Sequence, residues 1–190
     1  MSEVLVNPYN FVVGDVVVYE SGFTPDTFAM AGGMYGITYT QSGNYISNTG
    51  TGATIVGQDC NKVTFYVKSA GTSQTGTLYA RVYTFNGDPN APSGDSYNYE
   101  FGSMDISTIG TTAEYISFTN SSSNYTIQNN DTFCLWWNGS SFTNANALHV
   151  LGKAPFTTSG VAWTEWNESE DWNAVSTSQG YVKIEKLADP

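Results

Sequence analysis

Basic residues are scarce in this chain. Its 190 residues include only six lysines and arginines against 17 aspartates and glutamates, so the formal net charge is −11 at pH 7. Arg81 is the single arginine, and the five lysines are scattered. Nucleic acids and anionic membrane surfaces attract proteins through continuous basic stripes that release counterions or bind acidic headgroups. We therefore expect neither nucleic acid nor membrane as a partner.

Histidine and long apolar runs are scarce as well. His149 is the only histidine and lies in the apolar stretch NALHVLG, so neither a Ser-His-Asp triad nor a multi-histidine metal site can be assembled. The run FVVGDVVVY is too short for a membrane-spanning helix and is interrupted by Asp15. The opening residues MSEVLVNPYN show no basic region followed by an apolar one, so no secretory leader is visible; either it was removed and replaced by Met, or none existed.

The chain is instead rich in aromatic and uncharged polar residues. Hydrophobic residues make up 40% of it and aromatic residues 15%, which is enough for a core and argues against disorder. Ser, Thr, Asn, Gly and Tyr favour strands and turns, and such a surface is typical of extracellular or virion-borne proteins. Cys60 and Cys134 could form one disulfide or remain two buried thiols, and both alternatives stay open.

Period-two alternation is the dominant pattern. In KVTFYVK (62–68) and TLYARVYTF (77–85) every second residue is apolar, which predicts two strands with one buried face each. The intervening SAGTSQTG is rich in turn residues, so we predict that these strands form a hairpin. Further strands are predicted at 14–20, 34–40, 53–57, 114–120, 125–128, 132–139, 146–152 and 180–187.

This pattern predicts an all-β protein. Clusters of Gly, Ser, Asn and Pro separate the strands at the spacing of a β-sandwich, and we expect two packed antiparallel sheets in one domain spanning 1–190. The best helical candidate is a single turn in NESEDWNA (167–174), with Asn167 as N-cap. The segment 86–105 shows no clear strand pattern and is predicted to be a long loop.

Four stretches in order carry a resemblance: KVTFYVKSAGTSQTGTLYARVYTFNG, SMDISTIGTTAEYISFTNSSSNYTIQNNDTFCLWWNG, VAWTEW and GYVKIEKL. Together they resemble the diffuse family of jelly-roll, carbohydrate-binding-module-like β-sandwich domains of secreted, cell-surface and virion proteins. The resemblance covers 53–188, whereas 1–50 has no counterpart and is expected to pack on or extend the sandwich. It implies a jelly-roll fold and a surface setting, and its motifs are turn and core residues without a catalytic signature.

Outward-facing aromatic residues are the first candidates for a glycan-binding site, because sugar-binding proteins stack aromatic rings on the apolar faces of sugars. If Phe133 and Leu135 face the core, Trp136 faces outwards. The same alternation assigns an outward position to Tyr66, Tyr79 and Tyr83. The alternative is that N-terminal residues or a neighbouring subunit cover these rings.

The segment WTEWNESEDW (163–172) is the second candidate. Trp163 or Trp166 could form an aromatic platform, with Glu165, Glu168 and Asp171 as ligands for sugar hydroxyls or calcium. Alternatively, the tryptophans close one end of the sandwich while the carboxylates face water. In the segment 86–105, Asp88 and Asp95 could likewise bind calcium or belong to a solvated acidic loop. Calcium is the only cofactor that the sequence suggests, and no EF-hand spacing is present.

These features lead to three functional hypotheses. The first is a non-enzymatic structural or decoration protein of a virion, oligomeric or bound to other virion or surface proteins, which presents a glycan-binding face. The second is a secreted or cell-surface carbohydrate-binding module or adhesin. The third, a hydrolase using Glu165 with Glu168 or Asp171, has no catalytic motif to support it. We expect a location on the virion surface or outside the cell, and no catalytic residues.

Overall fold

The computed structural model describes residues 15–22, 24, 41–46, 55–69, 71, 74–84, 97–129, 131–138, 148–153, 161–166, 172–175 and 179–187. Within these residues the chain is built from strands β1 to β15 and one 3-10 helix, η1 (Ile106–Thr108). Every strand pair is antiparallel. The predicted all-β class is therefore confirmed. None of the helices in this part of the chain has the length and apolar character needed to cross a membrane.

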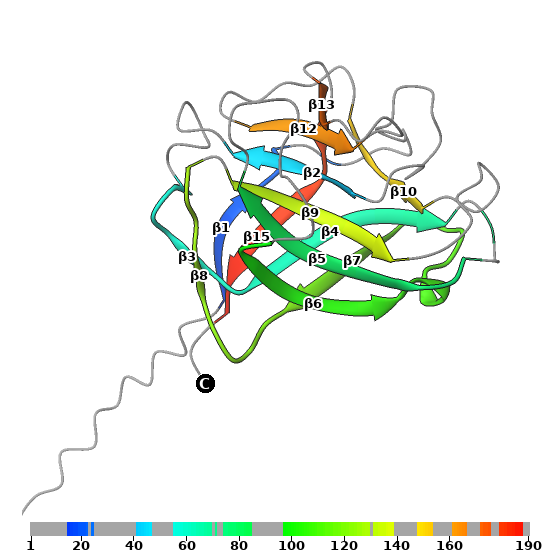
Figure 1. Cartoon of the computed structure of the whole chain (residues 1–190), viewed down its shortest axis with the longest axis horizontal. Helices are drawn as coiled ribbons and strands as arrows, with labels where there is room; N and C mark the ends of the chain where they lie inside the picture. Colours follow the sequence, from blue (N-terminus) through cyan, green and yellow to red (C-terminus); the bar gives the residue numbers. More distant parts are fainter. Residues whose placement is uncertain are drawn as a thin grey trace, which may run out of the picture.

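Two sheets make up most of the structure (Figure 1). The five-stranded sheet contains β1 (Val16–Glu20), β15 (Val182–Lys186), β4 (Lys62–Ser69), β10 (Leu148–Val150) and β7 (Glu114–Thr119). The six-stranded sheet runs β13 (Trp172–Val175), β12 (Val161–Trp166), β2 (Gln41–Ile46), β9 (Asp131–Asn138), β5 (Thr77–Thr84) and β6 (Tyr99–Asp105). Two small pairs accompany them: β3 (Asp59–Cys60) with β8 (Tyr125–Thr126), and β11 (Gly152–Lys153) with β14 (Gln179–Gly180).

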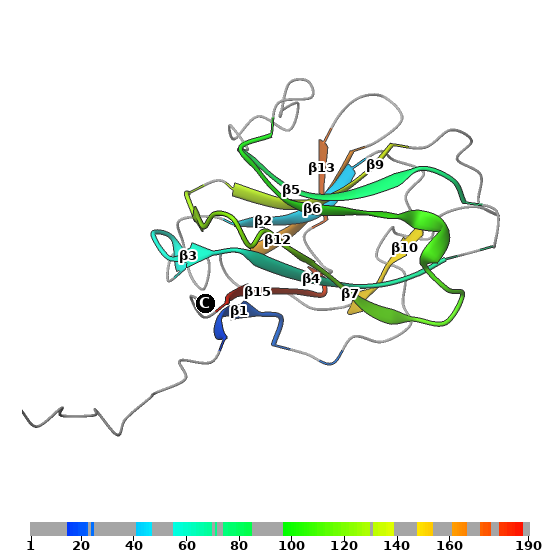
Figure 2. The same cartoon turned by 90° about the horizontal axis from the view of Figure 1, so that it is seen from below.

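The core lies between the two sheets, which pack as two layers (Figure 2). On β4 the alternation buries Val63, Phe65 and Val67, and on β5 it buries Leu78, Ala80 and Val82, as predicted. Phe133 and Leu135 of β9 also belong to the core. Burial of each large apolar side chain of this kind stabilises the fold by about 1.5–3 kcal/mol. The alternate residues on the same strands consequently form the outer faces of the sandwich.

The predicted hairpin of 62–68 and 77–85 is wrong. Strand β4 pairs with β7, β10 and β15, whereas β5 pairs with β6 and β9, so the two strands belong to different sheets. Strand β5 begins directly after Gly76, whose φ of 116° is a conformation that favours glycine. Alternation shows which face of a strand is buried, but it does not show whether the next strand lies beside it or across the core.

Two other predictions of local structure also fail. The strand predicted at 53–57 is wrong over its described part, 55–57, because Ile55 is helical and a turn follows it. Gly57 closes this turn with a φ of 86°, and its N–H donates to Ile127 O at 2.8 Å. The predicted loop 86–105 contains strand β6 from Tyr99 onwards. Residues 34–40, predicted as a strand, lie outside the described residues, and β2 just after them was not predicted.

The tryptophan-rich segment is not a simple loop. Strands β12 and β13 pair with each other, and Trp166 stands opposite Trp172 at the end of the ladder. Residues 172–174 are extended in β13, so the predicted helical turn over 167–174 is wrong in that part. Residues 167–171, including Glu168 and Asp171, lie outside the described residues. The segment thus extends the six-stranded sheet at its β13 edge.

Candidate functional site

A cluster of aromatic rings surrounds the only arginine of the chain on the outer face of the six-stranded sheet. The Arg81 guanidinium carbon lies 4.2 Å from the ring centre of Tyr79, 4.2 Å from that of Tyr97 and 4.5 Å from that of Trp136. The Arg81 Nε donates to Glu100 Oε2 at 2.8 Å. We call these five residues, Tyr79, Arg81, Tyr97, Glu100 and Trp136, the Arg81 platform.

Strand pairing brings the first part of the platform together. In the β5–β9 ladder Tyr79 stands directly opposite Trp136, and their ring centres are 5.3 Å apart with planes tilted by 53°. Both residues alternate with core residues of the same strand, Leu78 on β5 and Leu135 on β9. The pleat therefore directs the two rings away from the core, and cross-strand aromatic pairing of this kind stabilises the ladder.

A β-bulge places Glu100 against Arg81. The β5–β6 register runs from Ala80 opposite Gly102 to Arg81 opposite Glu100, so Phe101 is an extra residue on β6. Phe101 is buried in the core at 1% exposure, and Gly102 has a φ of 150°, where a side chain is strained. With regular pairing Phe101 itself would stand opposite Arg81. The bulge thus turns Phe101 into the core and brings the Glu100 carboxylate to the Arg81 guanidinium.

The electrostatics of the platform keep Arg81 charged and paired. Burial would lower the pKa of Arg81, but hydrogen bonds to Glu100 and Tyr83 raise it above its ordinary value. The Arg81 side chain is only 11% exposed and that of Glu100 29%. Tyr97, in contrast, is 42% exposed. The arrangement combines accessible ring surface with an ion pair whose oxygens and N–H groups can hydrogen-bond to a ligand.

Tyr83, predicted as a glycan contact, lies on the same side of β5 but is fully buried. Its ring meets that of Tyr97 edge-on, with centres 6.4 Å apart. A residue with 0% exposure cannot touch a bound sugar, so that assignment is wrong. Alternation gave the correct side of the strand, but it could not show that other residues cover this position. The buried Tyr83 thus supports the Arg81 platform through its ring contact with Tyr97.

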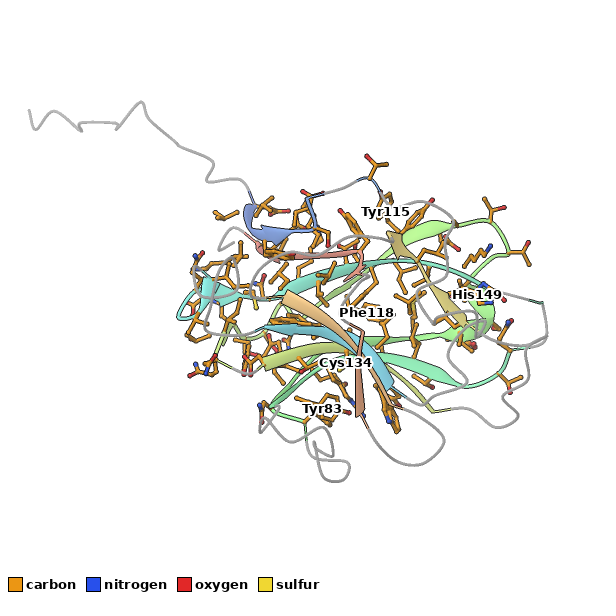
Figure 3. The ribbon with its side chains drawn as sticks, turned by 90° about the horizontal axis from the view of Figure 1, so that it is seen from above. Tyr83, Tyr115, Phe118, Cys134 and His149 are labelled. Atoms are coloured by element: carbon orange, nitrogen blue, oxygen red, sulfur yellow. The ribbon has the colours of Figure 1, made fainter. Side chains whose placement is uncertain are left out.

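The two cysteines are separate buried thiols. Cys60 lies in β3, while Cys134 lies in β9 opposite Arg81, within the six-stranded sheet (Figure 3). Burial raises the pKa of the Cys60 thiol to about 12, helped by Asp131 and Asp59, and burial alone raises that of Cys134. Of the two alternatives left open by the sequence, the structure adopts the thiols and not the disulfide. A raised pKa disfavours the thiolate, which is the nucleophilic form of cysteine.

Tyr66 belongs to a different surface. It lies on β4, and its ring packs at 4.6 Å from that of Tyr115 on β7, which in turn meets Tyr181 at 5.1 Å. Figure 3 shows Tyr83 and Tyr115 on opposite outer sides of the sandwich, with Phe118 between them. We call Tyr66, Tyr115 and Tyr181 the tyrosine row. The four aromatic candidates that alternation predicted to face outwards, Tyr66, Tyr79, Tyr83 and Trp136, are thus divided between two faces, because alternation does not say which sheet a strand joins.

The candidate residues of WTEWNESEDW are only partly described. Trp163, Glu165 and Trp166 lie in β12, where Trp163 stands opposite Asn44 of β2 and Val175 of β13. Asn44 in turn stands opposite Phe133. Four other predicted ligands lie outside the described residues: Asp88, Asp95, Glu168 and Asp171. For Trp163, Glu165 and Trp166 the structure describes the backbone only. In the described part of the chain, His, Cys, Asp and Glu form no group that could hold a metal ion, so calcium binding stays a prediction.

Sequence reasoning missed a buried acid. Asp131, at the start of β9, is 0% exposed, and its Oδ2 accepts from the Tyr125 hydroxyl at 2.8 Å and the Gln128 N–H at 2.7 Å. Its Oδ1 is buried, and no described residue donates to it. Burial raises the pKa of Asp131 to about 6, although both hydrogen bonds oppose that shift. The only signal in the sequence is an acid that directly precedes the apolar run TFCLWW.

Comparison with known proteins assigns no family. Neither a protein-family model, nor a curated protein, nor a solved structure matches this chain. The interpretation of the site therefore depends on the geometry of its own residues. That geometry points to the Arg81 platform, which combines strand-positioned rings, a paired cation and partly exposed surface.

Proposed function

We propose that this chain is a non-enzymatic structural or decoration protein of a virion, with a jelly-roll-like β-sandwich that presents the Arg81 platform to glycans. The observation that carries the glycan-binding part is the cluster of Tyr79, Tyr97 and Trp136 around the Arg81–Glu100 ion pair. Two of these rings, Tyr79 and Trp136, are among the aromatic residues that the sequence pattern already indicated.

The chemistry of the platform fits a sugar better than a purely apolar ligand. Sugars present C–H faces that stack on aromatic rings and hydroxyls that both donate and accept hydrogen bonds. Tyr97 is 42% exposed and supplies ring surface, while Glu100 offers carboxylate oxygen and Arg81 offers N–H groups. Such sites typically combine aromatic surface with a few polar groups that fix orientation.

The charge balance favours a neutral glycan. Glu100 already neutralises Arg81 through a bond of 2.8 Å, so the platform has no unpaired cation for a carboxylate or sulfate. The chain as a whole carries −11, which repels anionic polymers at long range. We therefore expect binding to neutral hexose chains and weaker binding to sialylated or sulfated ones.

The platform is built for binding and not for hydrolysis. A glycosidase mechanism needs two carboxyl groups on either side of the bond that breaks. The platform contains one carboxylate, Glu100, and Arg81 holds it as an ion pair.

The virion setting is supported by composition. Only 12% of the residues are charged, and the surface-forming residues are Tyr, Asn, Ser and Thr, as expected for a particle or extracellular surface. A secreted or cell-surface carbohydrate-binding module is the second candidate, because the same platform would serve a soluble binder. Incorporation into particles separates the two: a structural protein remains part of the particle when the platform is disabled.

Replacement of Trp136 by Ala tests the proposal. We expect the affinity for a neutral oligosaccharide, identified on a glycan array, to fall at least about 10-fold, since an aromatic contact residue typically contributes more than 1 kcal/mol. Titration calorimetry with the soluble, monovalent oligosaccharide gives this affinity without avidity effects. Tyr115→Ala, an exposed tyrosine on the opposite face, is the matched control and should bind normally. Wild-type protein that binds no array glycan would exclude the glycan-binding function.

A further inference from the structure

The strands of the five-stranded sheet differ in charge from the rest of the chain. Its strands contain four lysines, Lys62, Lys68, Lys183 and Lys186, against the three glutamates Glu20, Glu114 and Glu185. These strands therefore carry a net charge of +1, and all other residues together carry −12, which gives the total of −11. Four of the six basic residues of the chain are thus concentrated in one sheet.

Ion pairs fix part of this charge in place. Glu185 is almost fully buried, and its carboxylate accepts from Lys62 Nζ at 3.1 Å and from Lys183 Nζ at 2.9 Å. Burial would raise the pKa of Glu185, but the two lysines hold it below its ordinary value. Hydrogen-bonded pairs of this kind remove net charge from the face while leaving it polar. The face can consequently approach a second face of the same kind without the repulsion between strongly acidic surfaces.

The same sheet also exposes apolar surface. Among the described residues, four large hydrophobic side chains are exposed, and three of them belong to this sheet: Val16, Val17 and Tyr115. Tyr115 is 54% exposed and stacks on Tyr66, while the Tyr181 hydroxyl donates to Glu20 Oε1 at 2.7 Å. Tyrosine is enriched and charged residues are depleted at the centres of protein interfaces. Tyr115, the exposed member of the tyrosine row, is therefore suited to contact with another protein, while the buried Tyr181 supports its ring.

We propose that two copies of this chain associate face to face through the outer surface of the five-stranded sheet, with the tyrosine row at the centre. A pair of identical chains with −11 each repels over most of the molecular surface, and repulsion is smallest where two faces without net negative charge meet. Closed two-fold pairing through one self-complementary patch is the commonest form of self-association. The Arg81 platform lies on the other sheet, so both platforms of the dimer stay accessible.

The association does not depend on glycan binding, and a pair of matched tyrosine variants tests the two properties separately. Sedimentation velocity of the full chain over a concentration series gives the dimer dissociation constant. We expect Tyr115→Glu to weaken the dimer at least about 10-fold, as for a central interface residue. We expect Tyr97→Glu, an exposed tyrosine on the opposite sheet, to leave the dimer intact while it impairs the glycan platform.

A second variant guards against local misfolding at Tyr115. Val17→Glu places a charge on the same sheet at an exposed position and should weaken the dimer as well, while circular dichroism shows that both variants remain folded. Wild-type protein that stays monomeric at all concentrations overturns the proposal. A dimer that survives both Tyr115→Glu and Val17→Glu overturns it too. If the wild type is monomeric and Tyr115→Glu loses binding to the monovalent glycan, this face binds a sugar and not a second copy of the chain.

Discussion

At the scale of single residues, burial decides which polar side chains have unusual chemistry. Arg81 and Asp131 are both charged residues in largely enclosed positions, but their surroundings differ. Arg81 has Glu100 as a partner and stays charged, whereas Asp131 has two neutral donors and no cation among its hydrogen-bond partners. The pKa of Asp131 is therefore raised to about 6, and the charged form of this carboxylate opposes folding.

This shift has a defined effect on stability. The folded protein binds a proton to Asp131 below about pH 6, whereas the unfolded chain does so only near its ordinary value of 3.8. The stability that protonated Asp131 contributes is thus fully present below pH 3.8 and is lost as the pH rises to about 6. The free energy of unfolding should fall by roughly 3 kcal/mol over this range. Urea unfolding of the wild type at a series of pH values between these limits measures the loss.

The variant Asp131→Asn isolates this effect from other carboxylates. Its amide oxygen can accept from Tyr125 and Gln128 as the carboxylate does, but it does not titrate. The difference in unfolding free energy between variant and wild type should therefore shift in favour of the variant as the pH rises from 4 to 6. A difference that stays constant over this range would show that the pKa of Asp131 is not raised.

At the scale of elements, the bulge in β6 is the feature that assembles the site. A single extra residue moves Phe101 into the core and brings Glu100 to Arg81. The sequence gives little indication of it, because YEFGSMD lies after a stretch without alternation and contains one glycine. Bulges of this type depend on the residue that accepts the unusual backbone angle, here Gly102 with a φ of 150°.

Gly102→Ala tests the bulge. The position is strained for any side chain, so we expect a destabilisation of about 1–3 kcal/mol, together with weaker glycan binding as Glu100 leaves Arg81. The space itself is not the obstacle, because the nearest atom to an added Cβ is Thr119 O at 3.8 Å. Gly110→Ala, whose Cβ would also meet its nearest atom at an ordinary distance of 3.7 Å, serves as a control. Equal thermal stability of both variants would contradict a requirement for glycine at Gly102.

At the scale of the whole molecule, charge is distributed unevenly between the two outer faces. The strands of the five-stranded sheet carry a net +1 in a chain of −11. The proposed glycan platform lies on one sheet and the proposed pairing surface on the other, so a pair of chains would still present its binding sites. Both properties follow from which strands the fold places in each sheet.

The proposed dimer should respond to salt in a characteristic way. Long-range repulsion between two chains of −11 is screened when ionic strength rises from 0.01 M, where the Debye length is about 30 Å, to 0.15 M, where it is about 8 Å. We therefore expect the dimer dissociation constant to fall over this range in sedimentation experiments. A dimer that weakens with salt would be held by ion pairs between chains and not by the tyrosine row.

The sequence by itself determined the class of the fold and the side of each main strand that is buried. Alternation in KVTFYVK and TLYARVYTF correctly separated Val63 and Leu78 from Tyr66 and Tyr79, because the pleat of a strand has a period of two whatever its neighbours are. It also indicated Trp136 as an outward residue. These properties are local, and local properties can be predicted from a short stretch of sequence.

Only the tertiary structure decided which strands are neighbours. It placed β4 and β5 in different sheets, separated Tyr66 from Tyr79, covered Tyr83, and brought Tyr97 and Glu100 to Arg81 from a segment without a strand pattern. Each of these facts depends on pairing between segments that are distant in sequence or on a bulge in the register. Alternation contains no information about either, because it is the same for a strand in any sheet.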